Sequence, residues 1–440
     1  MTARRGAGVA AGLLLVLTAP GCAGGGGATR TGSATPFVAV DPASTSPTDR
    51  AIAVAQQRLK ARGDDSARLA LAQAFLQKAR EVGDPTFYAR AEALLDVTAN
   101  GREDDPVVLV AQGALALARH DFDEALKLGR RAVELAPGNV GALGVTVDAL
   151  NELGRYDEAL ARTQAMADTR PDLASLARVS YARELRGDTP GAITAMTQAA
   201  QAGAGAGENL AFVEVQLGML LLNSGDPAGA EAAFGRADQA FPGFAAAKAG
   251  RARVLVAQGR VGPAADLLGE VVAQLPAAEH AIAHAEALAA AGRRAEAAEA
   301  EALVGAIAGL YRANGVDVDL ELALFAADTE PGDEAVDQAR RAADRRPSVA
   351  GHDALAWSLF TAGDHRAAGR EMAKALVLGG RDPQLRFHAA AIAMALGQRA
   401  EATRHLEVVL ATNPRFSARH AAGVAALASR LGLALPPPSA

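Results

Sequence analysis

The stretch FDEALKLGRRAVELAPGN, residues 122–139, returns in altered form as YDEALARTQAMADTRPDL at residues 156–173. In both stretches an aromatic residue precedes Asp-Glu-Ala-Leu, and a Pro follows twelve residues after the Ala. This Ala can be followed through ten positions, separated by 33, 34 or 38 residues: Ala91, Ala125, Ala159, Ala192, Ala230, Ala264, Ala297, Ala335, Ala368 and Ala402. A period of this length predicts an array of helical repeats.

Two further positions carry the same period. Five residues before the Ala, seven units have a glycine: Gly154, Gly187, Gly225, Gly259, Gly292, Gly363 and Gly397. Twelve residues after it, six units have a proline: Pro137, Pro171, Pro242, Pro276, Pro347 and Pro414. Glycine permits the left-handed backbone that ends one helix, and proline ends the next because it has no N–H. Each unit is therefore predicted to be a helix–turn–helix pair.

These units resemble tetratricopeptide repeats. The matching residues in one unit are Gly113, Phe122, Ala125, Ala132 and Pro137, and in another they are Leu217, Gly218, Leu221, Gly225, Ala230, Phe234, Ala237 and Pro242. The resemblance runs from about residue 51 to 414 and implies an all-α, right-handed α-solenoid of about ten helix pairs, elongated in shape. We expect the solenoid to occupy residues 49–432, including a capping helix over 418–431, and a disordered tail to follow at 433–440. The family's usual Trp and Tyr positions are mostly Leu or Ala here.

Two units are longer than the others. In one, the extra residues 203–207 read Gly-Ala-Gly-Ala-Gly, which we interpret as a loop between repeats because neither a preceding strand nor a Lys-Ser/Thr pair marks a phosphate-binding loop. In the other, a helical pattern runs from Arg294 to about Arg312 and stops at Asn314-Gly315, so this helix should protrude beyond its neighbours.

The first 22 residues have the pattern of an export signal. Arg4 and Arg5 precede a short apolar run over residues 9–17, and Cys22, the only cysteine of the chain, follows it. This arrangement resembles the lipobox of bacterial lipoproteins, which implies that Cys22 is lipidated and anchors the chain to the membrane of the cell envelope. Ordinary secretion with cleavage near Ala23, or an uncleaved anchor, are the alternatives. Residues 23–48, rich in Gly, Ser, Thr and Pro, are predicted to be a disordered tether.

Composition and motifs give little sign of chemistry. A net charge of −6 argues against nucleic acid as a partner. His280 and His284 lie four residues apart, but zinc needs three or four convergent ligands. The acids Asp317, Asp319, Glu321 and Asp328 have calcium-loop spacing, but Leu322 occupies the place of the required Gly. We therefore expect no metal, no cofactor, no small-molecule substrate and no enzyme activity. The cluster Arg340, Arg341, Arg345 and Arg346, late in a helix, is interpreted as a solvated face.

The resemblance also implies where a partner would bind. In this repeat family the second, fifth, ninth and twelfth places of a unit face the concave groove, a spacing that defines one helix face. The residues at these places that we take as the partner groove are Phe212, Val215, Met219, Leu222, Leu320, Leu324, Asp353, Trp357, Phe360, Phe387 and Met394. Two interpretations remain open: these side chains pack against neighbouring helices, or Trp357, Phe360, Phe387 and Met394 form a hydrophobic site for a peptide.

The resemblance therefore implies a non-enzymatic, envelope-tethered adaptor that binds a protein or peptide. The alternative is an extracytoplasmic chaperone or capture receptor with many weak clients. The sequence identifies no particular partner and no oligomeric state.

Overall fold

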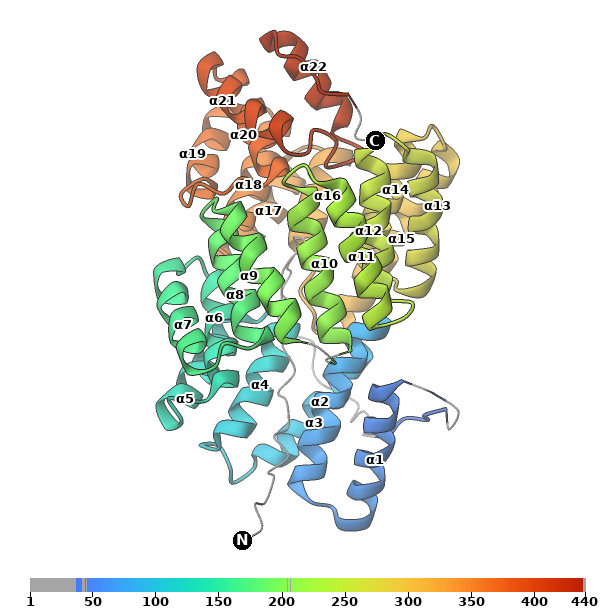
Figure 1. The fold of residues 1–440 in the computed structure, drawn as a ribbon, viewed down its shortest axis with the longest axis vertical. Helices are drawn as coiled ribbons and strands as arrows, with labels where there is room; N and C mark the ends of the chain where they lie inside the picture. Colours follow the sequence, from blue (N-terminus) through green and yellow to red (C-terminus); the bar gives the residue numbers. More distant parts are fainter. Residues whose placement is uncertain (1–36, 42–43, 45, 204, 206, 438–440) are drawn as a thin grey trace.

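The computed structural model describes residues 37–437 apart from 42–43, 45, 204 and 206, and these form an all-helical array (Figure 1). The chain begins with α1 (Pro47–Arg62) and ends with α22 (Ala421–Leu431), and ten helix pairs lie between them. The first helices of the pairs are α2 (Asp65–Val82), α4 (Pro106–Ala118), α6 (Val140–Glu152), α8 (Leu173–Leu185), α10 (Glu208–Leu222), α12 (Ala245–Ala257), α14 (Ala278–Ala290), α16 (Asp319–Thr329), α18 (Val349–Thr361) and α20 (Pro383–Ala395). The second helices are α3 (Thr86–Ala99), α5 (Phe122–Leu135), α7 (Tyr156–Thr169), α9 (Thr189–Ala202), α11 (Pro227–Ala240), α13 (Val261–Gln274), α15 (Arg294–Ala313), α17 (Asp333–Arg345), α19 (His365–Ala375) and α21 (Arg399–Ala411).

The predicted repeat marks have the predicted roles. All ten alanines lie in second helices, and none of their side chains is more than 5% exposed. All seven glycines have positive φ, between 68° and 93°. Asp188, Asp226 and Asp364 directly follow such glycines, and each side chain accepts a hydrogen bond from the backbone N–H three residues later. A Gly-Asp pair therefore ends one helix in the left-handed conformation and caps the start of the next.

His120 occupies the place of this glycine in the second of the ten units. Its φ is 63°, and within the described part of the chain it is the only residue other than Gly with positive φ. The ring Nδ1 lies 2.8 Å from the backbone carbonyl of Asp317, and the ring stacks on Phe122 at 5.6 Å. A left-handed backbone costs a residue with a Cβ about 1 kcal/mol or more, so these contacts offset local strain.

The contact between His120 and Asp317 belongs to a series that joins successive turns of the superhelix. Glu152 forms a buried ion pair with Arg346, and the backbone N–H of Val349 donates to the Tyr156 hydroxyl at 2.6 Å. The partners are 193 to 197 residues apart in the sequence. One superhelical turn thus takes between five and six repeats, and the second turn packs on the first.

Two of the turn glycines also lie at this junction. A Cβ on Gly154 would come within 2.3 Å of the Pro347 carbonyl oxygen, and one on Gly187 within 2.8 Å of the Gly379 carbonyl oxygen. Such distances leave no room for any side chain. Gly154 and Gly187, which follow the ends of first helices, therefore also let the two turns approach each other at these points.

The same junction corrects the interpretation of the late arginine cluster. Arg346 is not on a solvated face, because its side chain is 5% exposed, pairs with Glu152 and lies 5.4 Å from the centre of the Phe122 ring. Only the other members of the cluster fit the expectation: Arg340 and Arg345 are exposed and pair with Asp337 and Asp317. The sequence placed Arg346 near a helix end but could not show the turn that packs against it.

The two long units differ in their effect. Helix α9 ends at Ala202 and α10 begins at Glu208, so the Gly-rich insertion falls between two repeats, as predicted. Helix α15 has 20 residues and ends at Ala313, with Asn314 and Gly315 following. Val304 and Ile307 of α15 share an apolar cluster with Leu322 and Phe325 of α16, so the two helices still touch. Residues 314–318 separate α15 from α16, and Leu303 and Leu310 on the long helix are exposed.

Both ends of the folded body differ from the predicted boundaries. Val38 and Val40, inside the predicted tether 23–48, pack against the apolar cluster formed by helices α1 to α4. Leu433, inside the predicted tail 433–440, packs against the last apolar cluster. Cys22 and the signal segment 1–22 lie outside the described residues. Among the helices that are described, none is long and apolar enough to cross a bilayer.

Candidate functional site

The groove positions on α10 lie in an apolar cluster between neighbouring pairs. Val215 and Leu222 are buried, while Phe212 and Met219 are half-buried. The cluster also contains Phe234 of α11, Phe244, and Ala247 and Val254 of α12. These four positions therefore contribute to the interface between adjacent pairs and do not meet the C-terminal groove positions.

Most C-terminal groove positions come together in one cluster. Leu324 of α16, Trp357 and Phe360 of α18, and Phe387 and Met394 of α20 belong to the same apolar cluster. The Trp357 ring lies 5.0 Å from Phe360 and 5.9 Å from Phe387, measured between ring centroids. We call this set the C-terminal groove cluster. Leu320, in contrast, packs with Ala342 and Ala354 in a small separate cluster.

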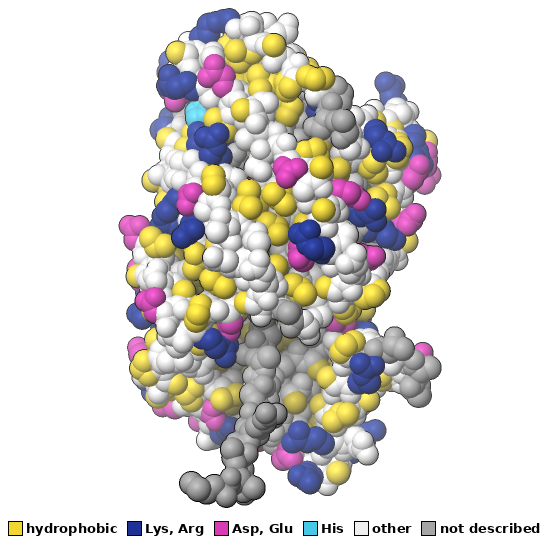
Figure 2. All heavy atoms as spheres, viewed as in Figure 1, with side chains coloured by type: hydrophobic (Ala, Val, Ile, Leu, Met, Phe, Trp, Pro, Cys, Tyr) yellow, Lys and Arg dark blue, Asp and Glu magenta, His cyan; other side chains and the backbone are white. Residues whose placement is uncertain are grey.

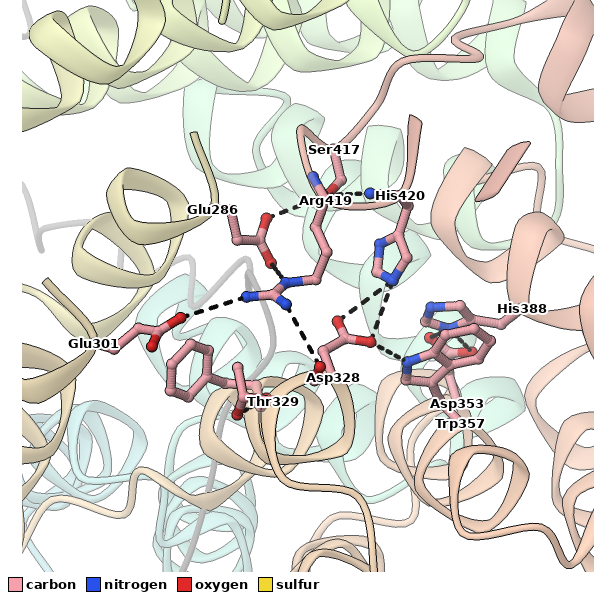
Figure 3. Close-up of polar contacts among 11 residues, drawn as sticks. Glu286, Glu301, Asp328, Thr329, Asp353, Trp357, His388, Ser417, Arg419 and His420 are labelled. Atoms are coloured by element: carbon pink, nitrogen blue, oxygen red, sulfur yellow. Dashed lines mark hydrogen bonds and ion pairs between the residues drawn. The ribbon is translucent and has the colours of Figure 1, made fainter. Parts of the chain in front are cut away.

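Polar bonds between first helices hold the cluster in place (Figure 3). The Trp357 indole N–H donates to Asp328 on α16 at 2.8 Å. The ring of His388 on α20 stacks on Trp357 at 4.0 Å, and its Nδ1 lies 2.9 Å from Asp353 on α18. Asp353 is thus a groove position that orients a buried histidine. These bonds tie α16, α18 and α20 together in one arrangement.

The chain's own C-terminal segment covers this cluster. Between α21 and α22 the chain crosses to α14 and α16, where Ser417 donates to Glu286 at 3.2 Å (Figure 3). The Arg419 guanidinium lies 3.3 Å from Glu286, 3.5 Å from the Asp328 carbonyl oxygen and 4.0 Å from Glu301. The His420 ring lies 3.3 Å from the Asp328 carboxylate. We call residues 413–431 the covering segment.

Apolar contacts complete the cover. Phe416 lies 5.9 Å from Phe387, and its ring stacks on His420 at 5.8 Å. Four side chains of α22 share the cluster with Phe387: Val424, Leu427, Ala428 and Leu431. A Cβ at Gly423 would come 3.0 Å from the Phe387 ring, so the helix approaches this ring closely where it has no side chain. The predicted capping helix therefore lies over predicted groove residues.

The charges of this site influence one another. Burial opposes the charge of His420, but the hydrogen bond and the negative charge of Asp328 outweigh it and raise the pKa of His420. Burial likewise favours a neutral Asp328, yet its contacts with His420 and Trp357 lower its pKa. Burial raises the pKa of Glu286, although Arg419 and His420 partly oppose this. Asp328 and His420 thus stabilise each other as an ion pair.

Sequence reasoning missed Asp328, His388, Glu286, Arg419 and His420 as members of this site. One signal was present. Arg419 and His420 directly precede the N-terminus of α22, where the helix dipole disfavours positive charge, and Asp328 lies in the last turn of α16, where it disfavours negative charge. Charges at the unfavourable ends of two helices indicate oppositely charged partners elsewhere in the fold. Here His420 pairs with the Asp328 carboxylate, and Arg419 contacts the Asp328 carbonyl oxygen.

The cavity at the junction of the two superhelical turns is small. The cavity lined by His120, Phe122, Asp317, Leu320, Ala342, Arg345 and Arg346 measures about 10 Å³, which is the space of one water molecule. No three His, Cys, Asp or Glu side chains within the described ranges gather as a metal site requires. His280 is buried, and the nearest carboxylate oxygen, from Glu279, is 3.7 Å away.

Comparisons with known proteins agree with the fold. The family model described as tetratricopeptide repeat matches residues 116–181 and 221–287. A comparison with curated protein sequences gives no match. Among solved structures, the APC/C hetero-tetramer Cut9-Hcn1 is 14% identical over 87% of this chain and 93% of that one, with a TM-score of 0.37.

Two further structures are similar at the same level. Yeast Tom70 is 14% identical over 82% of this chain and 95% of its own, with a TM-score of 0.34. PilF of Pseudomonas aeruginosa is 17% identical over 46% of this chain and 90% of its own, with a TM-score of 0.37. Scores this low give no information about partners. The chain thus matches the tetratricopeptide repeat family over residues 116–181 and 221–287, and these segments lie within an all-α solenoid of helix pairs.

Proposed function

We propose that the chain is a non-enzymatic adaptor that holds a small number of partner proteins on its helical surface. Stacked helix pairs present a long surface without any need for a deep pocket, which suits a protein-interaction scaffold. On the face shown in Figure 2, hydrophobic side chains are interspersed with charged ones over the whole length of the molecule. Such a mixed surface is typical of recognition by specific contacts rather than by one large apolar patch.

The observation that carries this proposal is the locking of the two superhelical turns. The Glu152–Arg346 ion pair, the Tyr156–Val349 hydrogen bond and the His120–Asp317 contact hold the turns in one relative position. A surface that is already arranged loses little conformational entropy when it binds one matching partner. A chaperone or capture receptor with many weak clients would need an adaptable surface. The fixed arrangement therefore favours the adaptor.

Cross-linking followed by affinity purification tests the adaptor. After cross-linking in cells, the purified chain should retain one or two proteins at near-stoichiometric amounts, and repeated washing should not change that set. The variant Glu152→Gln, which weakens the contact between turns, should retain less of the same proteins. A broad set of weakly held chains, unaffected by Glu152→Gln, would favour the chaperone instead.

The proposed location is the bacterial cell envelope, with the lipidated Cys22 as the anchor. One diacyl modification supplies two acyl chains, which suffice for stable attachment where a single chain is marginal. Cys22→Ser should therefore move the protein from the membrane fraction to the soluble envelope or the medium. A Ser33→Ala variant, outside the signal, should stay with the membrane. If Cys22→Ser stays there as well, the lipid anchor is wrong while the adaptor proposal stands.

A further inference from the structure

We propose that the covering segment, residues 413–431, is a displaceable internal ligand of the C-terminal groove cluster. The surface beneath it then binds a partner-protein segment of the same chemistry, with an aromatic residue and an Arg placed just before an amphipathic helix. This inference rests on the proposed adaptor function and deepens it by naming the class of segment that is bound.

Charge defines the partner. Glu286, Glu301 and Asp328 come from three helices, α14, α15 and α16, and all face Arg419 or His420. The two cations lie at the N-terminal end of α22, where they are unfavourable for their own helix. The three acidic residues of the groove therefore explain why the two cations lie at this helix end. A partner segment that replaces the covering segment has to bring positive charge, because the three carboxylates would otherwise have no cation beside them.

The groove cluster is held together without the covering segment. Its own bonds, from Trp357 to Asp328 and from His388 to Asp353, are 2.8 and 2.9 Å long. The polar contacts made by the segment are longer, between 3.2 and 4.0 Å. Hydrogen bonds weaken as they lengthen beyond about 3.2 Å. The segment can therefore leave while the walls keep their shape.

The apolar half of the segment is also weakly attached. Helix α22 is the last helix of the described array; it packs along α21 and approaches Phe387 of α20 at Gly423. Its apolar side chains, among them Val424 and Leu431, rest on a cluster whose other members belong to neighbouring first and second helices. A terminal helix that has neighbours on only one side opens at a lower free energy than the helices inside an array. The same apolar surface then becomes available to an incoming amphipathic helix.

The probe for this proposal is a labelled synthetic peptide with the sequence of residues 413–431. In the wild-type chain the tethered segment competes at an effective concentration on the order of mM, so the free peptide should bind poorly. The full-length variant Arg419→Ala weakens the internal competitor but keeps every groove residue. It should bind the wild-type peptide at least about tenfold more tightly than the wild-type chain does, since one charged contact is removed from the competitor.

Two controls isolate the charged contact. Arg430→Ala removes an exposed cation from the same helix, away from the acids, and should leave peptide binding at the wild-type level. Glu286→Gln, added to Arg419→Ala, should abolish the gain, as should an Arg419→Ala substitution within the peptide, because Glu286 is the carboxylate nearest to the Arg419 guanidinium. If Arg419→Ala lost helicity by circular dichroism, His420→Gln would serve as the weakened chain. Equal binding to the wild-type and weakened chains would overturn the proposal.

Other outcomes are equally decisive. A wild-type dimer that exchanges covering segments would assign the groove to a second copy of the chain and overturn the partner proposal. A chain that retains fixed partners after cross-linking, yet does not bind the peptide in any variant, would remain an adaptor and refute only the internal ligand. A chain that binds the peptide as expected but retains no fixed partner would refute the adaptor instead.

Discussion

Replacing Glu152 with Ala should loosen the contact between the two superhelical turns. Glu152 and Arg346 are 3% and 5% exposed, so the substitution leaves a buried guanidinium facing a site from which its carboxylate has been removed. Removing one partner of a buried ion pair costs about 3 to 5 kcal/mol. We expect the lower part of this range, about 3 kcal/mol, because Arg346 keeps its contact with the Phe122 ring.

Urea unfolding followed by circular dichroism measures this loss, and hydrogen exchange locates it. Amides of residues 153–156 and 348–350 should gain exchange together, because one contact holds both segments. The matched control is Glu158→Ala, which removes an exposed carboxylate that pairs with Arg130 and Arg155, and should unfold like the wild type. A loss below about 1 kcal/mol, or faster exchange in only one of the two segments, would refute the locked junction.

Three further predictions concern the groove cluster and the turn histidine. Trp357→Ala should cost about 3 to 5 kcal/mol of unfolding free energy in a denaturant titration, because the residue is 6% exposed and its ring stacks with Phe360 and His388. Hydrogen exchange of the α22 amides should accelerate as pH rises through the raised pKa of His420, because the charged form of His420, which pairs with Asp328, is then lost. Glu286, Arg419 and His388 also face the His420 ring. The variant His420→Gln should remove this pH dependence. Burial lowers the pKa of His120 to about 4, and the charge of Arg346 adds to the effect. The melting temperature of the protein should therefore fall as pH drops from 6.5 towards 4. The variant His120→Asn should show a smaller fall, and asparagine tolerates the left-handed backbone at this position.

The repeat could be predicted because its marks act locally. Gly187 ends α8 and Asp188 caps α9 through bonds that span a few residues, so each unit carries its own instructions. Each of the ten alanines lies in the second helix of its own pair, so the spacing between the alanines predicts where each pair falls in the sequence. The same reasoning predicted the length of α15, since a continuous helical pattern and Asn314-Gly315 set both of its ends.

The contacts between turns could not be predicted in this way. Each repeat is rotated slightly relative to the one before it, and these rotations add up over the five to six repeats that separate Glu152 from Arg346. No local sequence pattern sets that rotation. For the same reason Arg346 was assigned to a solvated face. The contact between turns is thus a property of the whole array.

The covering segment escaped prediction for a related reason. The sequence shows an amphipathic helix after Pro414, which fits a simple cap. That Arg419 and His420 cross to α14 and α16 depends on the path of residues 412–420 over the groove. Only the placement of cations before a helix N-terminus pointed to acidic partners, and it did not identify them.

The contact between Ser417 and Glu286 offers the most direct test of the covered groove. In a Cys22→Ser background, the double variant Ser417→Cys and Glu286→Cys would be treated with a short cross-linker that carries two thiol-reactive maleimides, at low protein concentration. The account predicts rapid cross-linking within one chain, and slow cross-linking when Ser429→Cys, on the exposed side of α22, replaces Ser417→Cys. Equal rates for the two pairs, or cross-links only between chains, would contradict it.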